Sequence, residues 1–458
     1  GITTYSPLRH WGAGPGKKVA VVGLGVTGVS VLKFLLRHGI MPDLFDSRDA
    51  LPETIANNDL LADSNLYLGE FKDGHFKGYD YVIVSPGISL ATPALVQARQ
   101  EIDNVFCDVE LFARINQKAV LAVTGSNGKS TVVAWLESFL NNVGKKAVAC
   151  GNYGVPVLDV IEQDYDVFIM ELSSFQLEST RSLVCEAATV LNVTEDHMDR
   201  YDSFEHYSCA KNKIYRRARR CLYNHDDFQT KPLISHNQVA SFGSMAACFE
   251  QTCWHFDPET QALKRNDDII ANLKNCNVSG AHNGLNALAV LALASAAGVD
   301  VKEKAHALAQ FSGLPHRCQF VAEHNGITFI NDSKATNIAS TQAALSGLSK
   351  GKNVILLAGG DAKGGDLSEL KASIDTSVKT LIAFGQDAAQ FSSFLSDKRL
   401  IQVENLEQAV RHAFRVSNSG DIVLLSPACA SIDMFQNYQQ RGDSFARFVK
   451  QLTNEANS

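Results

Sequence analysis

The chain has 458 residues, of which 45% are hydrophobic and 20% are charged, and its formal net charge is −7. This composition is typical of a soluble globular protein with enough length for about three domains, and the negative charge argues against a general binder of nucleic acid or anionic membranes. No secretory signal is recognisable, so we expect the ten cysteines to be reduced thiols in a cytosol.

The first motif is a strand followed by a glycine turn and a helix start. Gly23, Gly25 and Gly28 match G-x-G-x-x-G, and the next strand ends in Asp46-Ser-Arg48, at the spacing of an acid that contacts a ribose. Ser85-Pro-Gly87 follows a further strand, either as a turn whose backbone faces a ligand or as a simple chain reversal.

This glycine fingerprint also fits an NAD-binding domain. Only about 100 residues precede the next phosphate-binding motif, which is enough for one mononucleotide-type unit but not for the doubled dinucleotide fold. The sequence therefore predicts a Rossmann-like domain over residues 1–107, and the NAD-binding alternative stays open at this point.

The strongest motif is Thr124-Gly-Ser-Asn-Gly-Lys-Ser-Thr131, between an apolar strand and an amphipathic helix. Gly125 and Gly128 allow the backbone to turn so that N–H groups meet an anion at the helix N-terminus. Lys129 adds a positive charge for terminal phosphates, and the hydroxyl of Ser130 or Thr131 can bind Mg²⁺. The motif predicts an ATP site.

Two further strands of the central segment end in polar residues. Glu171 ends an apolar strand at the edge where ligands meet a parallel sheet, and is either a metal ligand or an edge carboxylate bonded to a serine. Asp196, His197 and Asp199 follow the next strand and are expected beside the metal and phosphates. The basic run Arg216–Arg220 is expected on a solvated or interdomain helix face.

An Ala-rich helix follows and reaches Val299, which is too short to span a bilayer. Asn283 and Asn286 lie near its start, with amides available to read a base. Residues 229–280 show weak patterning, and we predict no element there. The central domain, residues 108–313, is predicted to be a P-loop ATPase-like parallel sheet.

From Leu314 the chain restarts as alternating strands and helices, which predicts a third, Rossmann-like domain over residues 314–458. Polar turns of small residues follow three of its strands, at residues 331–337, 359–365 and 426–431. Such turns suit a charged small molecule. The predicted fold class is thus α/β with three domains.

Together the motifs resemble the Mur ligases of peptidoglycan synthesis, over nearly the whole chain. The resemblance rests on the shortened loop at 124–131 and on Asn192-Val-Thr-Glu-Asp-His-Met-Asp199, Ala210-Lys211, His282-Asn-Gly-Leu-Asn286, Leu314-Pro-His-Arg317 and Asn331-Asp-Ser-Lys334. The N-terminal glycine turn and the segment Leu425–Ser431 are most similar to the member that adds D-glutamate. The Asp-Asn-Pro-Arg signature of the diaminopimelate- or lysine-adding relative is absent.

The resemblance implies an ATP-dependent ligase that forms an amide bond between UDP-N-acetylmuramoyl-L-alanine and D-glutamate through an acyl phosphate. It implies ATP and two Mg²⁺ ions, with Lys129, Asn152, Glu171, His197 and Lys211 as catalytic residues. Lys211 is expected to react with CO₂ to form a carbamate. Lys213 is the second choice, because the spacing from His197 is one residue shorter than in the family pattern. The implied metal ligands are Ser130, Glu171, His197 and the carbamate.

The remaining site residues are also implied by the resemblance. For ATP they are Gly125, Ser126, Asn127, Gly128, Lys129, Ser130, Thr131, Asn283, Asn286, Arg317, Asp332 and Lys334. For the UDP-substrate they are Thr27, Gly28, Asp46, Ser47, Arg48, Ser85, Pro86 and Gly87. For D-glutamate they are Thr336, Lys363, Ser431 and Tyr438. The implied protein is a monomer of the bacterial cytoplasm that binds small molecules, with no nucleic-acid or membrane partner.

Three other classes remain as alternatives. A folylpolyglutamate synthetase shares the central motifs but should lack the N-terminal glycine-turn domain. A nucleotide-dependent dehydrogenase explains the glycine fingerprint but leaves the phosphate loop without a role. A non-catalytic nucleotide sensor has no need for the acidic and lysine positions around His197.

Overall fold

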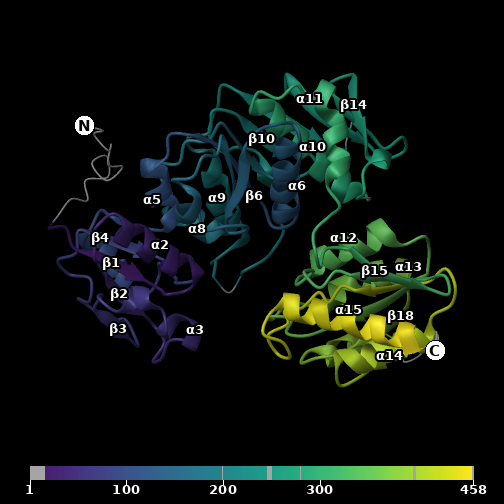
Figure 1. The fold of residues 1–458 in the computed structure, drawn as a ribbon. Helices are drawn as coiled ribbons and strands as arrows, with labels where there is room; N and C mark the ends of the chain where they lie inside the picture. Colours follow the sequence, from purple (N-terminus) through teal and green to yellow (C-terminus); the bar gives the residue numbers. More distant parts are fainter. Residues whose placement is uncertain (1–15, 199, 245–249, 279, 396–398, 456–458) are drawn as a thin grey trace. The chain divides into compact units, whose positions relative to one another are not determined.

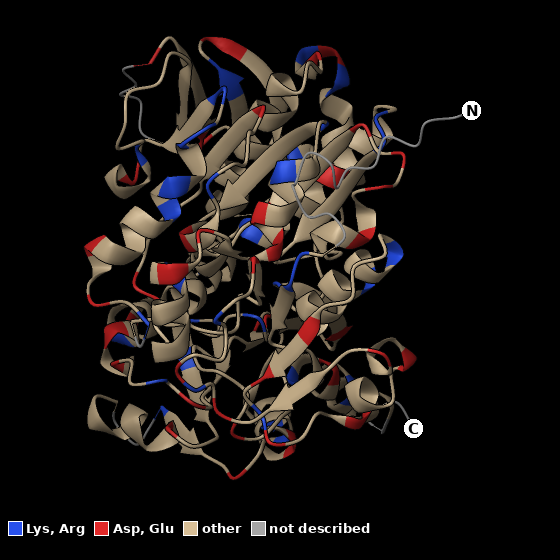
Figure 2. Cartoon of the chain, turned by 90° about the vertical axis from the view of Figure 1, so that its left-hand side faces the viewer, with Lys and Arg blue, Asp and Glu red and all other residues tan. Residues whose placement is uncertain are grey.

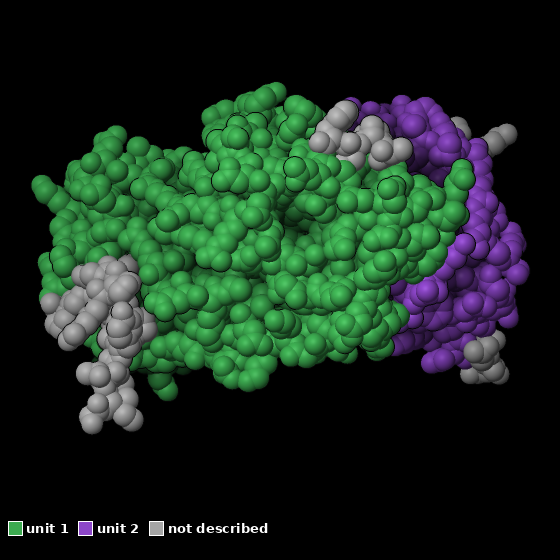
Figure 3. Space-filling view, turned by 90° about the horizontal axis from the view of Figure 1, so that it is seen from above, with its two compact units in different colours: residues 1–272, 286–310 green, residues 273–285, 311–458 purple. Residues whose placement is uncertain are grey.

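The computed structural model describes residues 16–198, 200–244, 250–278, 280–395 and 399–455. The chain forms two compact units, one of residues 1–272 and 286–310 and one of residues 273–285 and 311–458 (Figure 3). Three β-sheets run through these units in chain order (Figure 1). The predicted α/β class with three sheet domains is confirmed.

The N-terminal sheet is parallel, with the strand order β3-β2-β1-β4-β5. Its strands are β1 (Val19–Val22), β2 (Asp43–Asp46), β3 (Leu66–Leu68), β4 (Tyr81–Val84) and β5 (Val105–Phe106), and its helices are α2 (Val26–Arg37), α3 (Glu53–Ala56) and α4 (Pro93–Glu101). This is more than the single mononucleotide-type unit that we predicted. Strands β3 and β5 have only three and two residues, and such short strands leave little pattern in the sequence. The sheet still stops one strand short of the doubled dinucleotide fold.

The central sheet has nine strands in the order β14-β13-β12-β11-β10-β9-β6-β8-β7. Its strands are β6 (Ala119–Thr124), β7 (Ala147–Gly151), β8 (Val167–Glu171), β9 (Ala187–Val190), β10 (Cys221–Asn224), β11 (Val239–Gly243), β12 (Thr252–Asp257), β13 (Ala262–Arg265) and β14 (Asp268–Asn272). The sheet is parallel up to β12, as predicted, but β13 and β14 pair antiparallel, so the whole sheet is mixed. Four of these strands lie in the region where the weak pattern predicted none.

Helices of the central segment are α5 (Asp108–Ile115), α6 (Lys129–Asn142), α7 (Val157–Val160), α8 (Ser174–Ser179), α9 (Phe204–Asn212), α10 (Ala281–Ala296) and α11 (Val301–Lys304). Helix α10 is buried from Asn286 to Ala294, which confirms the predicted core helix. The helix predicted for Arg216–Arg220 is wrong. The chain leaves α9 through a 3₁₀ turn at Lys213–Tyr215, and Arg219 and Arg220 pair with Glu186 instead.

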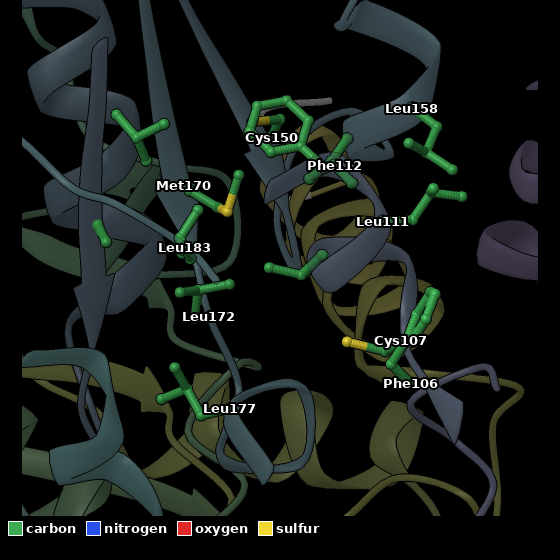
Figure 4. Close-up of a cluster of buried hydrophobic side chains, with 14 of the residues drawn as sticks. Phe106, Cys107, Leu111, Phe112, Cys150, Leu158, Met170, Leu172, Leu177 and Leu183 are labelled. Atoms are coloured by element: carbon green, nitrogen blue, oxygen red, sulfur yellow. The ribbon is translucent and has the colours of Figure 1, made fainter. Parts of the chain in front are cut away.

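A continuous apolar cluster joins the N-terminal sheet to the central sheet within the first unit. Figure 4 shows Phe106, Leu111 and Phe112 from β5 and α5 in the same cluster as Met170 and Leu172 at the end of β8. The ring of Phe112 meets that of Phe168 edge-on, with the centroids 5.1 Å apart. Burial of this much apolar surface holds β6 and β8 in fixed register, and the phosphate loop follows β6 directly.

The C-terminal sheet has the order β15-β16-β20-β17-β18-β19 and is parallel except for the β15–β16 pair. Its strands are β15 (Gln319–His324), β16 (Ile327–Asn331), β17 (Val354–Ala358), β18 (Val378–Ala383), β19 (Leu400–Gln402) and β20 (Ile422–Leu425), and its helices are α12 (Ile338–Leu348), α13 (Lys371–Ser377), α14 (Leu406–Val416) and α15 (Tyr438–Glu455). The polar turns predicted as binding segments follow β16, β17 and β20.

Basic and acidic residues are interspersed along the chain in the view of Figure 2. Within the described residues no helix is long and apolar enough to cross a membrane. Five cysteines are buried thiols, namely Cys107, Cys150, Cys185, Cys221 and Cys429. Cys253, in contrast, is disulfide-bonded, so the prediction that all ten cysteines are reduced is wrong at that position.

Asp108, the first residue of α5, yields a test of stability against pH. It is 3% exposed, and its Oδ1 has no hydrogen-bond partner. Burial raises the pKa of this carboxyl to about 6. The folded-state pKa of Asp108 is above the unfolded value. The contribution of this carboxyl to the free energy of unfolding is therefore fully present below the unfolded pKa and is lost as the pH rises through about 6.

The variant Asp108→Asn should therefore be more stable than the parent at neutral pH, by up to about 3 kcal/mol at about 1.4 kcal/mol per pH unit. Thermal unfolding at several pH values measures this, with Asp103→Asn on the exposed surface as the control. Parallel stability profiles for Asp108→Asn and the parent would show that the carboxyl does not titrate in this way.

Candidate functional site

The phosphate loop connects β6 to α6 and is fixed by the segment that follows β9. Gly125 and Gly128 have φ values of 148° and 84°, which L side chains rarely adopt. The backbone N–H of Ser126 donates to the Asn192 carbonyl (2.9 Å), and that of Asn127 donates to Asn192 Oδ1 (2.8 Å). These two loop amides are therefore bonded within the protein. The first turn of α6 has the N–H donors that remain for an anion.

Two lysines converge on one carbonyl oxygen of this loop. The Nζ of Lys129 donates to the carbonyls of Gly125 (2.8 Å) and Ser126 (2.9 Å). The Nζ of Lys211, from α9, donates to the same Gly125 carbonyl (2.9 Å) and lies 4.4 Å from the centre of the Tyr207 ring. The sequence motifs placed these lysines 82 positions apart, and the fold brings them together.

Lys211 is only 2% exposed. Burial lowers the pKa of its ammonium well below the usual range, and the charge of Lys129 lowers it further, while Asp196 and Glu171 act in the opposite direction. Taking an ammonium out of water beside a second cation favours the neutral amine. Lys211 thus has the environment of a nucleophilic amine.

Glu171 ends β8 next to the loop, because β8 pairs with β6 through Val123 and Glu171. Its Oε1 accepts a hydrogen bond from Asn152 Nδ2 (2.7 Å), so two predicted residues meet. Its Oε2 is buried and has no hydrogen-bond partner among the described residues. A buried carboxylate oxygen left in this state is costly unless a cation compensates it, so Glu171 fits a hard divalent ion.

His197 lies in the loop after β9, in the left-handed region at φ 58°. Its ring meets Phe175 edge-on, and its Nε2 is 3.7 Å from Asp196 Oδ2. Asp199 lies outside the described residues. Within the described ranges no group of three His, Cys, Asp or Glu residues is arranged to hold a metal. Mg²⁺ usually takes one or two carboxylates and completes its shell with phosphates and water, which is compatible with Ser130 and Glu171 alone.

The remaining predicted ATP residues divide between the two units. Asn286 belongs to the first unit and lies against the loop, since a Cβ on Gly128 would be 2.8 Å from its Oδ1. Ser130 is buried in the first turn of α6, and Thr131 is half-buried next to it. Asn283, Arg317, Asp332 and Lys334 belong to the second unit.

In the N-terminal sheet, the predicted uridine-nucleotide residues gather where β1, β2 and β4 end. Asp46 Oδ2 accepts from the Leu24 amide (2.7 Å), and Arg48 Nε is 2.7 Å from Asp46 Oδ1. Burial raises the pKa of Asp46, but the hydrogen bonds from Arg48 and Leu24 outweigh it, so the net pKa lies below its ordinary value. Asp46 therefore stays ionised and orients Arg48, whose guanidinium is exposed.

The turn after β4 packs directly on the glycine turn, since a Cβ on Gly23 would lie 2.9 Å from that of Ser85. Gly28 has no room for a side chain, because its Cβ would lie 2.0 Å from the Gly23 carbonyl. Around this point the structure places the other predicted residues at the surface or partly buried: Thr27, Ser47, Pro86 and Gly87.

In the second unit, the turns after β16 and β20 are joined by a residue that the sequence did not predict. Arg441 on α15 is fully buried; it donates to Ser333 Oγ (3.0 Å) and the Ser333 carbonyl (2.9 Å), and to the carbonyls of Cys429 (3.1 Å) and Ala430 (3.2 Å). The only signal in the sequence was a lone arginine near the start of a helix, which is commonly a surface residue.

Five predicted D-glutamate or ATP residues lie around these turns and the turn after β17. The Nζ of Lys334 lies 4.2 Å from the centre of the Tyr438 ring, and Ser431 is buried beside Ala430. Thr336 is half-buried in the turn after β16, with its N–H on the Lys334 carbonyl. Lys363 is exposed after β17 at φ 50°, with its N–H on Asp361 Oδ1.

Asp332 is buried in the same turn and accepts from Ser426 Oγ (2.8 Å) and the Cys318 amide (3.1 Å). Burial raises the pKa of its carboxyl to about 7 in spite of these bonds. A group with that pKa exchanges its proton near neutral pH.

Comparison with known proteins gives the class of protein that this arrangement belongs to. The Mur ligase middle domain matches residues 123–294, the MurD-like N-terminal domain of Mur ligases matches residues 17–106, and the Mur ligase glutamate ligase domain matches residues 316–429. The chain belongs to the Mur ligase family.

Among individual proteins, the chain is 42% identical over 445 residues to the UDP-N-acetylmuramoylalanine--D-glutamate ligase of Escherichia coli (strain K12), which covers 95% of this chain and 99% of that protein. A protein of the same name from Pseudoalteromonas translucida is 42% identical over 448 residues, 96% of this chain and 99% of that one.

Two solved structures share the fold. The UDP-N-acetylmuramate-alanine ligase of Thermotoga maritima has a TM-score of 0.59 at 20% identity, covering 96% of this chain and 99% of that one. A pseudomurein peptide ligase type C from Methanothermus fervidus has a TM-score of 0.61 at 16% identity, covering 95% and 100%.

The contact between Gly128 and Asn286 can be tested with a matched pair of variants. Gly128 and Gly144 have φ values of 84° and 87°, but a Cβ meets Asn286 at the first position and nothing within 4 Å at the second. Gly144→Ala should cost only the backbone term of about 1–2 kcal/mol in unfolding free energy. Gly128→Ala should cost more and also weaken ATP binding about tenfold or more.

Calorimetric titration with a non-hydrolysable ATP analogue, together with thermal unfolding, measures both effects. Equal affinity for the nucleotide in Gly128→Ala and Gly144→Ala would contradict the assignment of Asn286 and this loop to the ATP site.

Proposed function

We propose that this protein joins D-glutamate to UDP-N-acetylmuramoyl-L-alanine at the expense of ATP. The observation that carries the ATP-dependent chemistry is the convergence of Lys129, Lys211 and the unpaired Oε2 of Glu171 at the phosphate loop. Identity of 42% along 95% of the chain with ligases of that name supports the two substrates.

A carboxylate does not react with an amine at neutral pH, so the reaction requires activation. An oxygen of the L-alanyl carboxylate attacks the terminal phosphorus of ATP, and ADP leaves. The amine of D-glutamate then attacks the acyl phosphate, the C–N bond forms, and phosphate leaves from the tetrahedral intermediate. Catalysis of such a transfer is mainly positioning and charge neutralisation.

Each residue near the loop has a role in this proposal. Lys129 exchanges its carbonyl partners for the terminal phosphates, and the α6 N-terminus binds them through N–H groups. Mg²⁺, held by Ser130 and Glu171 and by His197 at a second position, would neutralise phosphate charge. Asn152 holds the Glu171 carboxylate in place and positions the substrate.

For the remaining residues the proposal follows the resemblance. Arg48, oriented by Asp46, binds the uridine nucleotide together with Gly28 and the turn Ser85–Gly87. Lys363, Thr336 and Ser431, with the backbone near Tyr438, bind D-glutamate. Asn283, Asn286, Arg317, Asp332 and Lys334 bind ATP. We propose residues 1–107 as the domain for the uridine nucleotide, residues 108–313 as that for ATP and residues 314–458 as that for D-glutamate. That the protein is a monomer in the bacterial cytoplasm remains a prediction.

The alternatives lose support from the N-terminal segment. Residues 17–106 match a MurD-like domain, which a folylpolyglutamate synthetase should lack. Asp46, the acid of the dehydrogenase fingerprint, is already occupied by Arg48 and the Leu24 amide, which argues against a ribose contact.

The decisive assay is phosphate release from ATP with UDP-N-acetylmuramoyl-L-alanine and D-Glu, L-Glu or L-Lys. Release coupled to amide formation is expected only with D-Glu. Lys129→Ala should remain folded and form no product, because the phosphates lose their cation. ATP consumption that ignores both substrates would overturn the proposal.

We also propose that Lys211 carries a carbamate. The neutral amine attacks CO₂, a C–N bond forms, and one proton is released to solvent. Support comes from the burial of Lys211 and from the suppression of its charge. Burial lowers the pKa of Lys213 as well, but Lys213 is only partly buried, whereas the Nζ of Lys211 lies on the phosphate loop.

Lys211→Ala should lower kcat by about 100-fold or more, and short carboxylates should restore part of the activity because they replace the lost anion. Lys213→Ala is the matched control and should keep most of the activity. A fully active Lys211→Ala variant would show that Lys211 carries no catalytic carbamate. Rescue by carboxylates that is confined to Lys213→Ala would assign the carbamate to Lys213.

A further inference from the structure

A cavity of about 790 Å³ lies at the amino-terminal edge of the central sheet. The starts of β9, β10, β11 and β12 line it, with Ala187, Cys221, Val239 and Thr252. The end of α10 contributes Ala292, Leu293, Ser295 and Ala296. These four strands are parallel neighbours, so their carboxyl ends, where the phosphate loop packs, are at the opposite edge. This cavity is thus separate from the phosphate loop, and its size suits a small-molecule ligand.

Arg265 gives the cavity a cation without a carboxylate partner. It stands at the end of β13, opposite Trp254 on β12, with its guanidinium carbon 5.7 Å from the centre of the indole ring. The Arg265 side chain makes no ion pair or hydrogen bond within the described residues, and Trp254 is only 2% exposed. The guanidinium fork is therefore held by the ring and keeps its N–H donors for a ligand.

A second polar group in the lining also lacks a partner. The Nε2 of His236 is buried and makes no hydrogen bond to any residue that the structure describes. Such an atom is costly unless a ligand or water satisfies it. Of the other charged groups in the lining, Arg220 is paired with Glu186 and donates to the Ala296 carbonyl. The Glu250 carboxylate accepts a hydrogen bond from the neutral Tyr223 hydroxyl (3.0 Å).

The rest of the lining combines apolar side chains, such as Leu222 and Trp254, with polar ones, such as Asn237, Gln238 and Asn266, and its exposed surface is more polar than apolar. A cation without an ion-pair partner, an imidazole nitrogen without a hydrogen bond and several neutral amide side chains match the oxygens of a small organic anion. Arg binds carboxylate and phosphate oxygens alike, through two parallel N–H donors.

We propose that this cavity is a second binding site, which takes a small organic carboxylate or phosphate monoester with its oxyanion on Arg265 and His236. The site is independent of the ligase reaction and does not compete with ATP, because the phosphate loop lies at the other end of the same strands.

The test uses benzoate, phenyl phosphate and the neutral analogue benzamide as probes. Each is titrated calorimetrically into the full-length protein with a saturating non-hydrolysable ATP analogue, UDP, Mg²⁺ and D-glutamate, so that the other proposed anion sites are filled. Benzoate or phenyl phosphate should bind, benzamide should bind at least about tenfold more weakly, and the tighter of the two anions identifies the class of ligand.

Arg265→Gln keeps a stem over Trp254 and should weaken anion binding about tenfold or more, whereas Arg265→Lys should restore part of it. Lys264→Gln is the matched control. Lys264 directly precedes Arg265 in β13, pairs with Asp257 and is not part of the lining, so anion binding should be unchanged. Thermal unfolding checks that the variants are folded. Absence of binding to the parent protein, equal binding of benzamide, or unchanged affinity in Arg265→Gln would overturn the proposal.

Discussion

The Gly125 carbonyl accepts hydrogen bonds from both Lys129 and Lys211, and this shared oxygen governs the electrostatics of the phosphate loop. Two ammonium groups at one acceptor repel each other, and the more buried of the two loses most by remaining charged. Lys211, at 2% exposed, is the one whose pKa falls. Lys129 is less buried than Lys211, so the two lysines stand in different environments although they share one acceptor.

The loop can hold this arrangement because its backbone is committed elsewhere. Asn192 accepts from the amides of Ser126 and Asn127, and it extends from a strand that pairs directly with β6. Because Gly125 and Gly128 have no side chains, Leu191 and Asn286 can pack directly against the loop. The site is therefore preorganised by the register of β6 with β8 and β9, which the apolar core maintains.

Apolar runs that end in polar residues were sufficient to predict most strands near the site. Glu171 and the turns after β16, β17 and β20 lie where parallel strands end, as their patterns indicated. Strands β11 to β14 were missed because they are only partly buried, so their hydrophobic periodicity is weak. The arginine run after α9 was wrongly assigned to a helix, since its pairing with Glu186 is a tertiary contact.

Other features of the site were beyond the reach of a single sequence because they depend on long-range packing. Three of these features depend on segments that are far apart in the chain. They are the burial of Lys211, the unpaired Oε2 of Glu171 and the four hydrogen bonds of Arg441. The glycine fingerprint even pointed to a dinucleotide, although Asp46 is consumed by Arg48 in the structure. A motif thus defines a local backbone shape, whereas the ligand that it serves depends on which side chains the rest of the fold has left unsatisfied.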